Sequence, residues 1–162
     1  MAIIWLLAIV IILLFGFTVL FGAPFLPTLK TRTDDALDLL DLTPGQTLLE
    51  LGSGDGRLLG AAAKRGIYSI GYELNPLLVL YSKIRLWPYR QYAQVHMRNY
   101  WTIELPQADG IYVFLLQKYM QKLHKKITHS KITPVKLVSF AFTVPNKKPA
   151  QTVRGMYLYL YK

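Results

Sequence analysis

An apolar run that breaks into three alternating glycines constrains this chain more than any other stretch. Residues 48–51 are Leu-Leu-Glu-Leu, long enough for a buried strand, and glycines occupy every second position over 52–56. The backbone of such a turn can approach a ligand closely because it lacks side chains. After a helix-length interval, a second short strand, 68–72, is followed by the carboxylate of Glu73. Two adjacent strands would thus present a glycine turn and an acid at their carboxyl ends, where open α/β sheets bind nucleosides.

Residue types that bind metals are sparse in this chain. There is no cysteine, which excludes disulfides and thiolate metal sites. The three histidines, His96, His124 and His129, do not have the spacing of a metal-binding motif. We therefore expect no metal centre.

Charge is the strongest compositional bias. The chain carries 19 lysines and arginines against 9 acids, and every charged residue after Asp109 is basic. A basic domain is attracted to anionic lipid headgroups, with about 1 kcal/mol for each well-placed lysine or arginine. Nucleic acid is the competing partner, and we favour the membrane because of the apolar N-terminal segment.

That segment, residues 2–22, contains no charged side chain. A helix of this length rises about 30 Å, the thickness of the hydrocarbon core of a bilayer. A cleaved signal peptide is the alternative, but it has a basic leader and a shorter apolar region. We expect an uncleaved, single-pass transmembrane anchor over residues 1–22.

The segment after the anchor, residues 23–32, contains two prolines, which prevent the helix from continuing. We expect it to be a linker to the main domain, residues 33–162. Lys30 and Arg32 follow the anchor, and the positive-inside tendency then places the main domain on the cytoplasmic side of the membrane.

Hydrophobic periodicity and turn signals predict the elements of the main domain. Thr33 should cap a short helix whose first turn carries two aspartates. Asn75 should cap the helix that follows the second strand, with Pro76 at its first position. Predicted strands cover residues 47–51, 68–72, 93–97, 111–116, 136–144 and 152–161, and predicted helices cover residues 57–65, 77–86 and 117–128. Only residues 145–151 join the last two strands, too few for a parallel crossover, so these strands should form an antiparallel hairpin. Four β–α units with one antiparallel edge predict an α/β fold with a doubly wound, mostly parallel sheet.

The glycine turn differs from the dinucleotide-binding fingerprint. Its glycines alternate without the two-residue gap, and Glu50 and Asp55 would repel a pyrophosphate while suiting a cationic ligand. Glu73, 23 residues after Glu50, is placed to accept hydrogen bonds from both ribose hydroxyls through its two oxygens. An adenosine-bearing ligand with a positive charge fits these positions, and S-adenosyl-L-methionine is such a ligand.

These residues resemble the first motif of the class I S-adenosylmethionine-dependent methyltransferases, an acid followed by Gly-x-Gly-x-Gly. Three stretches narrow the resemblance to the small membrane-anchored protein-lysine methyltransferases: Leu-Gly-Ser-Gly-Asp-Gly-Arg, Gly-Tyr-Glu-Leu-Asn-Pro, and Pro-Phe-Leu-Pro-Thr after the apolar segment. Animal members of that family act in mitochondria on the adenine nucleotide carrier and on the c subunit of the ATP synthase. The resemblance implies a Rossmann-like fold, here with a shortened C-terminal half.

The resemblance also implies which residues contact the cofactor. The methionine portion would be surrounded by Glu50 and the turn residues Gly52, Ser53, Gly54 and Gly56, and Asp55 of the turn would also contact the cofactor. Glu73 would hold the ribose. The adenine would lie against Leu74 and Asn75, and Asn99, which stands where the family tends to have an acid, would bond the adenine amino group.

The resemblance further implies a lysine acceptor on a membrane-associated protein. Methyl transfer is a direct displacement, so the task of the protein is to align donor and acceptor. A lysine must lose a proton from a pKa of about 10.4, which a desolvating aromatic pocket assists. Tyr100, Trp101 and Phe142 are the candidates for that pocket. Two other hypotheses stay open: methyl transfer to a lipid headgroup or small amine, and a non-catalytic relative that binds membranes through its basic surface.

Overall fold

The computed structural model describes residue 1, residues 4–5 and residues 30–162. Nearly all of the predicted anchor and most of the predicted linker lie outside these described residues. Within the described part, no helix combines the length and the apolar character that crossing a bilayer requires. Helix α2 (Lys30–Leu40) begins within the last three residues of the predicted linker.

The prediction that Thr33 caps this helix is wrong, because Thr33 lies inside α2. The first residues of α2, which precede the predicted helix start, contact the C-terminal part of the chain. Arg32 donates a hydrogen bond to the carbonyl of Arg154, and its guanidinium lies 5.5 Å from the ring centroid of Phe140. Asp35 forms an ion pair with Arg154 at 3.0 Å. These tertiary contacts are not visible in the local sequence, where Thr33 followed by two aspartates has the pattern of a helix start.

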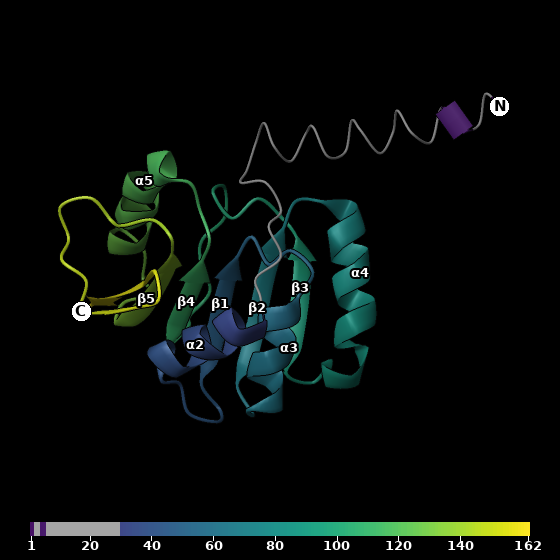
Figure 1. Ribbon diagram of the computed structural model, residues 1–162, viewed down its shortest axis with the longest axis horizontal. Helices are drawn as coiled ribbons and strands as arrows, with labels where there is room; N and C mark the ends of the chain where they lie inside the picture. The colour runs from purple at the N-terminus through teal and green to yellow at the C-terminus, as the bar shows by residue number, and fades with distance from the viewer. Residues whose placement is uncertain (2–3, 6–29) are drawn as a thin grey trace.

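A seven-stranded sheet forms the centre of the domain (Figure 1). Its strands are β1 (Thr47–Leu51), β2 (Tyr68–Glu73), β3 (Ala93–Met97), β4 (Gly110–Val113), β5 (Val135–Phe140), β6 (Gln151–Val153) and β7 (Met156–Tyr161). They lie in the order β3-β2-β1-β4-β5-β7-β6. Strands β1 to β5 are parallel to one another, whereas β7 runs antiparallel to both β5 and β6. The predicted mostly parallel sheet with an antiparallel end is confirmed.

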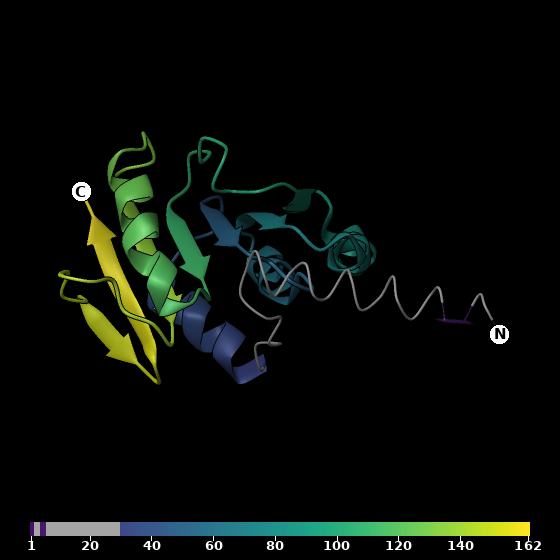
Figure 2. The same cartoon turned by 90° about the horizontal axis from the view of Figure 1, so that it is seen from above.

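Helices cover both faces of this sheet (Figure 2). They are α2, α3 (Arg57–Lys64), α4 (Pro76–Leu86) and α5 (Gln117–Thr128). Successive residues of β1 are buried in different cores. Leu48 packs in the core that contains Leu37 of α2, and Leu49 packs in the core that contains Met120 of α5. The continuous apolar run of β1 is therefore explained by burial on both sides.

The predicted count of four β–α units is too high by one. Residues 98–109, between β3 and β4, contain no helix or strand. Tyr100, Leu105 and Ala108 of this segment are buried in the same core as α5. The irregular segment thus covers part of the sheet face that a helix covers elsewhere.

The predicted final strand, 152–161, is two strands joined by a tight turn. Arg154 and Gly155 at the turn both have positive φ, 47° and 79°. Such a pair is typical of the two-residue hairpin turns that match the twist of a sheet. The antiparallel neighbour of β5 is therefore β7, and β6 forms the outer edge.

Strand β2 passes close to the glycine turn at Gly71. A Cβ atom at Gly71 would lie 2.6 Å from Oγ of Ser53 and 2.6 Å from Cδ1 of Leu59. Glycine is therefore required at this position by the packing of β2 against the turn and α3.

We expect Gly71→Ala to lower the free energy of unfolding by about 1–3 kcal/mol, because the added methyl group overpacks this contact. The matched control is Gly60→Ala on α3, where a Cβ would lie 3.5 Å from Leu86, an ordinary contact. Alanine in a helix is favoured over glycine by about 0.5–1 kcal/mol, so the control should be as stable as the parent chain or more so. Urea unfolding followed by circular dichroism measures both variants, and equal stability of the two would contradict the packing argument.

Candidate active site

The carboxyl ends of β1 to β5 meet along one edge of the sheet, the upper edge in Figure 1. The glycine turn follows β1, and Glu73 ends β2. Residues 99–101 follow β3, and Phe142 follows β5. The parallel sheet thus brings every predicted site segment to the same edge.

The turn after β1 is built from backbone conformations that favour glycine. Gly52, Gly54 and Gly56 have φ angles of 87°, 53° and 72°. The N–H groups of Gly52 and Ser53 donate to the carbonyl of Tyr72 at 2.9 and 3.0 Å, which ties the turn to β2. A Cβ atom at Gly52 would meet no described atom within 4 Å. Space for a ligand is therefore open beside the start of the turn.

Glu73 joins the turn to the start of α4. Its Oε2 accepts a hydrogen bond from the N–H of Gly54 at 2.9 Å. Its Oε1 accepts from the N–H groups of Leu74 and Asn75, each at 2.8 Å. The two hydrogen bonds to Oε1 use both of its lone pairs, and Oε2 keeps one lone pair that can accept a further hydrogen bond. The carboxylate therefore has a structural role that the sequence did not indicate, and the predicted two-oxygen contact with a ribose stays a prediction.

The carboxylate of Glu50 is buried at the end of β1. The residue is 6% exposed, and its Oε2 has no hydrogen-bond partner among the described residues. Burial, followed by the negative charges of Asp55 and Glu73, raises the pKa of Glu50 well above its ordinary value of 4.5. A buried acceptor without a donor is costly, and a cationic ligand would supply the missing partner. The site therefore fits the positively charged methionine portion of S-adenosylmethionine.

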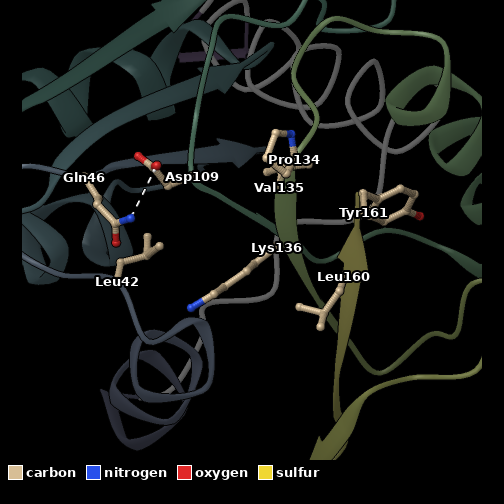
Figure 3. A pocket seen from close by; sticks show the side chains of 8 residues that line it. All are labelled: Leu42, Gln46, Asp109, Pro134, Val135, Lys136, Leu160 and Tyr161. Carbon is tan, nitrogen blue, oxygen red and sulfur yellow. Dashed lines mark hydrogen bonds between the residues drawn. The ribbon is translucent and has the colours of Figure 1, made fainter.

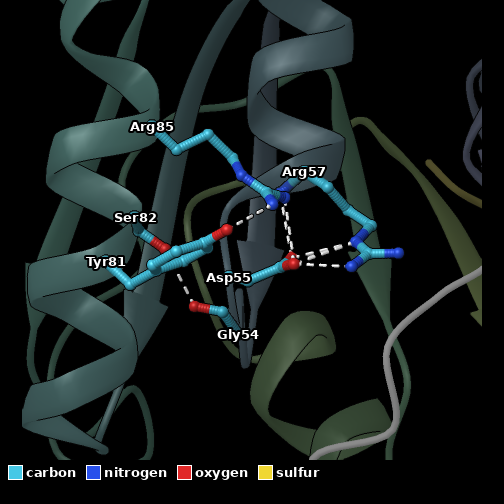
Figure 4. Close-up of polar contacts among 6 residues, drawn as sticks. All are labelled: Gly54, Asp55, Arg57, Tyr81, Ser82 and Arg85. Atoms are coloured by element: carbon cyan, nitrogen blue, oxygen red, sulfur yellow. Dashed lines mark hydrogen bonds and ion pairs between the residues drawn. The ribbon is translucent and has the colours of Figure 1, made fainter.

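Two arginines hold Asp55 (Figure 4). Oδ2 of Asp55 lies 2.6 Å from Nη2 of Arg57 and 2.9 Å from Nη1 of Arg85. Burial raises the pKa of Asp55, but the hydrogen bond and charge of Arg57 and the charge of Arg85 outweigh burial, so the pKa is lowered overall. Oγ of Ser82 donates to the carbonyl of Gly54 at 2.9 Å. Asp55 and Ser82 thus fasten the turn to α3 and α4, and the Asp55 carboxylate is paired with arginines.

The two predicted asparagines also bond the local backbone. Oδ1 of Asn75 accepts from two N–H groups in the first turn of α4, at 2.9 and 3.4 Å, so the predicted helix cap is confirmed. Oδ1 of Asn99 accepts from the N–H of Trp101 at 3.0 Å. Leu74 is half-buried between Glu73 and the cap. The predicted adenine contacts of these three residues stay predictions.

Tyr100 and Trp101 form an aromatic group with α5. Their ring centroids lie 4.8 Å apart, and the Trp101 ring lies 6.2 Å from that of Tyr119. Nζ of Lys122 lies 4.5 Å from the centroid of the Trp101 ring. Burial, followed by the negative charge of Glu73, raises the pKa of Tyr100. The phenol of Tyr100 is therefore neutral at physiological pH.

Phe142 belongs to a second aromatic group at the same edge. Its ring stacks on Phe114 with centroids 6.4 Å apart, and Phe114 also contacts Phe140 at 5.1 Å. Oγ of Ser139 donates to the carbonyl of Phe142 at 2.7 Å, which fixes the backbone after β5. Phe114 was not among the predicted site residues. The predicted strand 111–116 placed Phe114 inside a strand, whereas β4 ends at Val113, so Phe114 lies at the carboxyl edge.

A hollow of about 250 Å³ lies at the opposite edge of the sheet, where β1, β4 and β5 begin (Figure 3). Its polar groups are already bonded within the fold. Asp109 accepts hydrogen bonds from the N–H of Thr47 at 2.7 Å and from Nε2 of Gln46 at 3.4 Å. Lys136 donates to two carbonyls at the end of α2, at 2.8 and 2.9 Å. This hollow is separate from the site at the carboxyl edge.

Comparisons with known proteins extend over most of the chain. Residues 50–151 match the family model described as the ANTKMT methyltransferase domain. The chain is 33% identical over 130 residues to the ATP synthase c-subunit lysine N-methyltransferase of Xenopus laevis, covering 78% of this chain and 56% of that protein. It is 32% identical over 133 residues to the adenine nucleotide translocase lysine N-methyltransferase of Mus musculus, covering 80% and 58%. The chain thus spans little more than half the length of these relatives.

Solved structures share the fold. The crystal structure of an RNA methyltransferase from Salinibacter ruber, in complex with S-adenosyl-L-homocysteine, superposes with a TM-score of 0.78 at 25% identity, covering 83% of this chain and 93% of that chain. A SAM-dependent methyltransferase from Geobacter sulfurreducens superposes with a TM-score of 0.61 at 17% identity, covering 75% and 53%.

The strand order, the glycine turn and the acid at the end of β2 define the class I S-adenosylmethionine-dependent methyltransferase fold. S-adenosyl-L-methionine is the cofactor of this class. Within it, the chain belongs to the ANTKMT methyltransferase domain family, as the match over residues 50–151 shows. The family resemblance of the sequence motifs is confirmed.

Glu50→Gln tests the buried charge through stability. Because the folded-state pKa of Glu50 is raised, the stability linked to its bound proton is complete below pH 4.5 and is lost as the pH rises through the folded-state pKa. Glutamine does not titrate. We therefore expect the cofactor-free variant to lose less stability than the parent chain as the pH rises from 4.5 to 7. Thermal unfolding measured across this pH range checks the slope.

The same variant should bind S-adenosylmethionine about 10- to 100-fold more weakly, because a hydrogen bond to a charged acceptor is lost. Isothermal titration calorimetry measures this affinity. Asp38→Asn makes the same chemical change at an exposed carboxylate outside the turn, and it should leave the affinity unchanged. Unchanged affinity in Glu50→Gln would contradict the assigned role.

Ser82→Ala tests how α4 holds the glycine turn. It leaves the carbonyl of Gly54 without its side-chain donor, which should cost about 1–2 kcal/mol of stability and also weaken cofactor binding. Ser69→Ala is the control, since the buried Oγ of Ser69 donates to the carbonyl of Leu59 at 3.1 Å, away from the turn. Both variants should lose stability, and only Ser82→Ala should lose affinity in calorimetric titrations. Equal affinity losses would show that the effect is not specific to the turn.

Proposed function

We propose that this protein is a protein-lysine N-methyltransferase that uses S-adenosylmethionine and acts on a membrane-associated protein. The observation that carries the proposal is the buried Oε2 of Glu50, which has no hydrogen-bond partner among the described residues and lies beside the glycine turn, in a chain about one-third identical to named lysine methyltransferases. Glu50, the turn and Glu73 would hold the cofactor, which supplies a methyl group bonded to a positively charged sulfur.

The role of the protein in methyl transfer is to align the acceptor with the cofactor. The bound cofactor would supply its methyl group for a direct displacement by an acceptor amine, and the residues of the site would align the amine with that group. The amine nitrogen attacks as a neutral group, and its proton is released to water. The aromatic rings at the ends of β3, β4 and β5 are the chain's candidates for holding the side chain of the acceptor.

The surroundings of Trp101 favour a neutral acceptor amine. A lysine side chain has an ordinary pKa of about 10.4, so the charged form must be disfavoured in the site. Aromatic walls remove water, and the ammonium of Lys122, 4.5 Å from the Trp101 centroid, adds a like charge. Desolvation and a like charge both lower the pKa of an amine.

Glu73→Ala tests the proposal. Removal of the carboxylate takes away three hydrogen bonds that hold the turn and the predicted ribose contact, so we expect affinity for S-adenosyl-L-homocysteine to fall by at least about 10-fold. Isothermal titration measures the affinity, and Glu104→Ala, at an exposed acid outside the turn, is the control. In membranes from cells that lack the gene, the parent chain with methyl-labelled cofactor should label lysines of a protein, as peptide mass spectrometry detects. No cofactor binding by the parent chain would overturn the proposal.

RNA is the second candidate acceptor. The Salinibacter ruber protein with the same fold is an RNA methyltransferase, and this chain carries a net charge of +10. The labelling experiment separates the candidates, because protein, lipid and RNA fractions of the same extract can be counted independently. Label confined to RNA would favour this second candidate, and label confined to lipid would favour a lipid headgroup.

We further propose that residues 1–22 anchor the protein in a membrane, with residues 33–162 on the cytoplasmic side. The uncharged run of residues 2–22, followed by Lys30 and Arg32, supports this proposal. The full chain should resist extraction by alkaline carbonate, and a C-terminal tag should be cleaved by protease added from the cytoplasmic side. Release by carbonate would contradict the anchor, and a protected tag would contradict the orientation.

A further inference from the structure

The outer side of α4 carries a row of exposed apolar side chains. The members, here called the α4 stripe, are Leu77, Leu80, Tyr81, Ile84 and Trp87, which are between 45% and 68% exposed. They recur at intervals of three and four residues, so they share one side of the helix and its short 3-10 extension η1 (Trp87–Tyr89). Single exposed apolar residues are ordinary, but a contiguous row of five is typical of an interaction surface.

The stripe is not needed for the core of the domain. Val79, Ser82 and Leu86 are the buried residues of α4, and they lie on the opposite side of the helix. Figures 1 and 2 show α4 at the β3 end of the sheet, away from the C-terminal hairpin. Because β3 is the last strand at this end, no further helix or strand of the described residues covers the stripe.

Cations border the α4 stripe. At 100° per residue, Lys83 and Arg85 lie on its two flanks. The guanidinium of Arg85 lies 5.0 Å from the ring centroid of Tyr81, and that of Arg90 lies 4.9 Å from that of Trp87. Residues 74–103 contain no aspartate or glutamate. An apolar row that includes aromatic rings and has cationic flanks is the pattern of helices that lie in a membrane interface.

We propose that the α4 stripe docks on the surface of an anionic lipid bilayer. The apolar side chains enter the boundary between headgroups and acyl chains, and Lys83 and Arg90 contact lipid phosphates. This surface is independent of the identity of the methyl acceptor.

The charges favour lipid over the other occupants of such a surface. In a symmetric dimer the stripe would meet itself, and the cations of Lys83 and Arg90 would face cations with no acid in residues 74–103 to pair with them. The apolar run of residues 2–22 has no acid either, so it would leave the same cations unpaired. An anionic bilayer would both bury the apolar side chains of the stripe and supply negative charges to the cations beside it.

Docking of α4 on a bilayer would also fix the position of the candidate active site relative to the membrane surface. Helix α4 begins three residues after Glu73, at the edge that carries the glycine turn. Its inner side holds that turn through Ser82 and Arg85. A domain resting on α4 therefore holds the cofactor edge beside the bilayer surface rather than far above it.

Spin labels on the full chain test the proposal, because the sequence has no cysteine and one can be introduced at will. Ile84→Cys places a nitroxide in the stripe, and Gln121→Cys places one on the exposed side of α5 as a control. In vesicles of phosphatidylcholine with phosphatidylglycerol, the Ile84 label should collide mainly with oxygen, which partitions into lipid, and little with a water-soluble nickel complex. The Gln121 label should collide with the nickel complex.

Two results would overturn the proposal in this arm. One is equal nickel accessibility at the two positions in anionic vesicles, which would leave the stripe in water. The other is dipolar broadening between Ile84 labels that disappears when unlabelled protein is added, which would show that a second copy covers the stripe. Neither readout depends on cofactor binding, so failure here is distinguishable from failure of the proposed methyl transfer.

A charge arm completes the test. With two cations, Lys83 and Arg90, at the interface, the ratio of docked to undocked protein should be about 30-fold lower in pure phosphatidylcholine vesicles. In anionic vesicles, Lys83→Glu should lower this ratio by about 10-fold or more, whereas Lys125→Glu makes the same charge change on α5 and should leave it unchanged. Equal effects of the two substitutions would show attraction to the basic domain as a whole and would overturn the assignment to α4.

Discussion

The hydrogen bond from the N–H of Gly54 to the carboxylate of Glu73, at 2.9 Å, joins the ends of the two central strands of the site. Without it the glycine turn would rely on the carbonyl of Tyr72 and on contacts with α4. The bond is possible because Gly71 lets β2 approach the turn without a side chain in between. The same carboxylate then organises the first residues before α4 through Leu74 and Asn75. One side chain thus couples the turn, the second strand and the helix that follows it.

The pKa values of Glu50, at the end of β1, and Asp55, in the turn, are shifted in opposite directions because their surroundings differ. Asp55 is surrounded by Arg57 and Arg85, which lower its pKa and keep it ionised in a partly buried place. Glu50 is buried, its Oε2 has no partner among the described residues, and burial raises its pKa. The fold therefore leaves one carboxylate oxygen of Glu50, in β1, without a donor among the described residues, and it pairs Asp55, two residues before α3, with arginines. This difference is what makes the turn suited to a cation and, at the same time, structurally sound.

Local signals in the sequence were sufficient for much of the architecture. Asn75 followed by Pro76 predicted the start of α4, and the apolar run before the glycines predicted β1, because capping and burial on both faces are properties of adjacent residues. Long-range contacts decided the rest. The start of α2 depends on Arg154, more than 100 residues away, and the cover over one sheet face depends on the irregular segment 98–109. Neither has a periodic pattern from which it could be predicted.

The sequence by itself determined the kind of ligand and the edge of the sheet that binds it. The glycine spacing differs from the dinucleotide fingerprint, the charges of Glu50 and Asp55 disfavour a pyrophosphate, and parallel strands bring their carboxyl ends together whatever the packing. Only the tertiary structure decided how each acid is used and which aromatic rings meet. Glu73 bonds three backbone groups, and Phe142 meets Phe114 rather than forming a ring contact with Trp101 among the described residues. The physical reason is that hydrogen bonds and ring contacts depend on distances between strands, which a linear pattern does not contain.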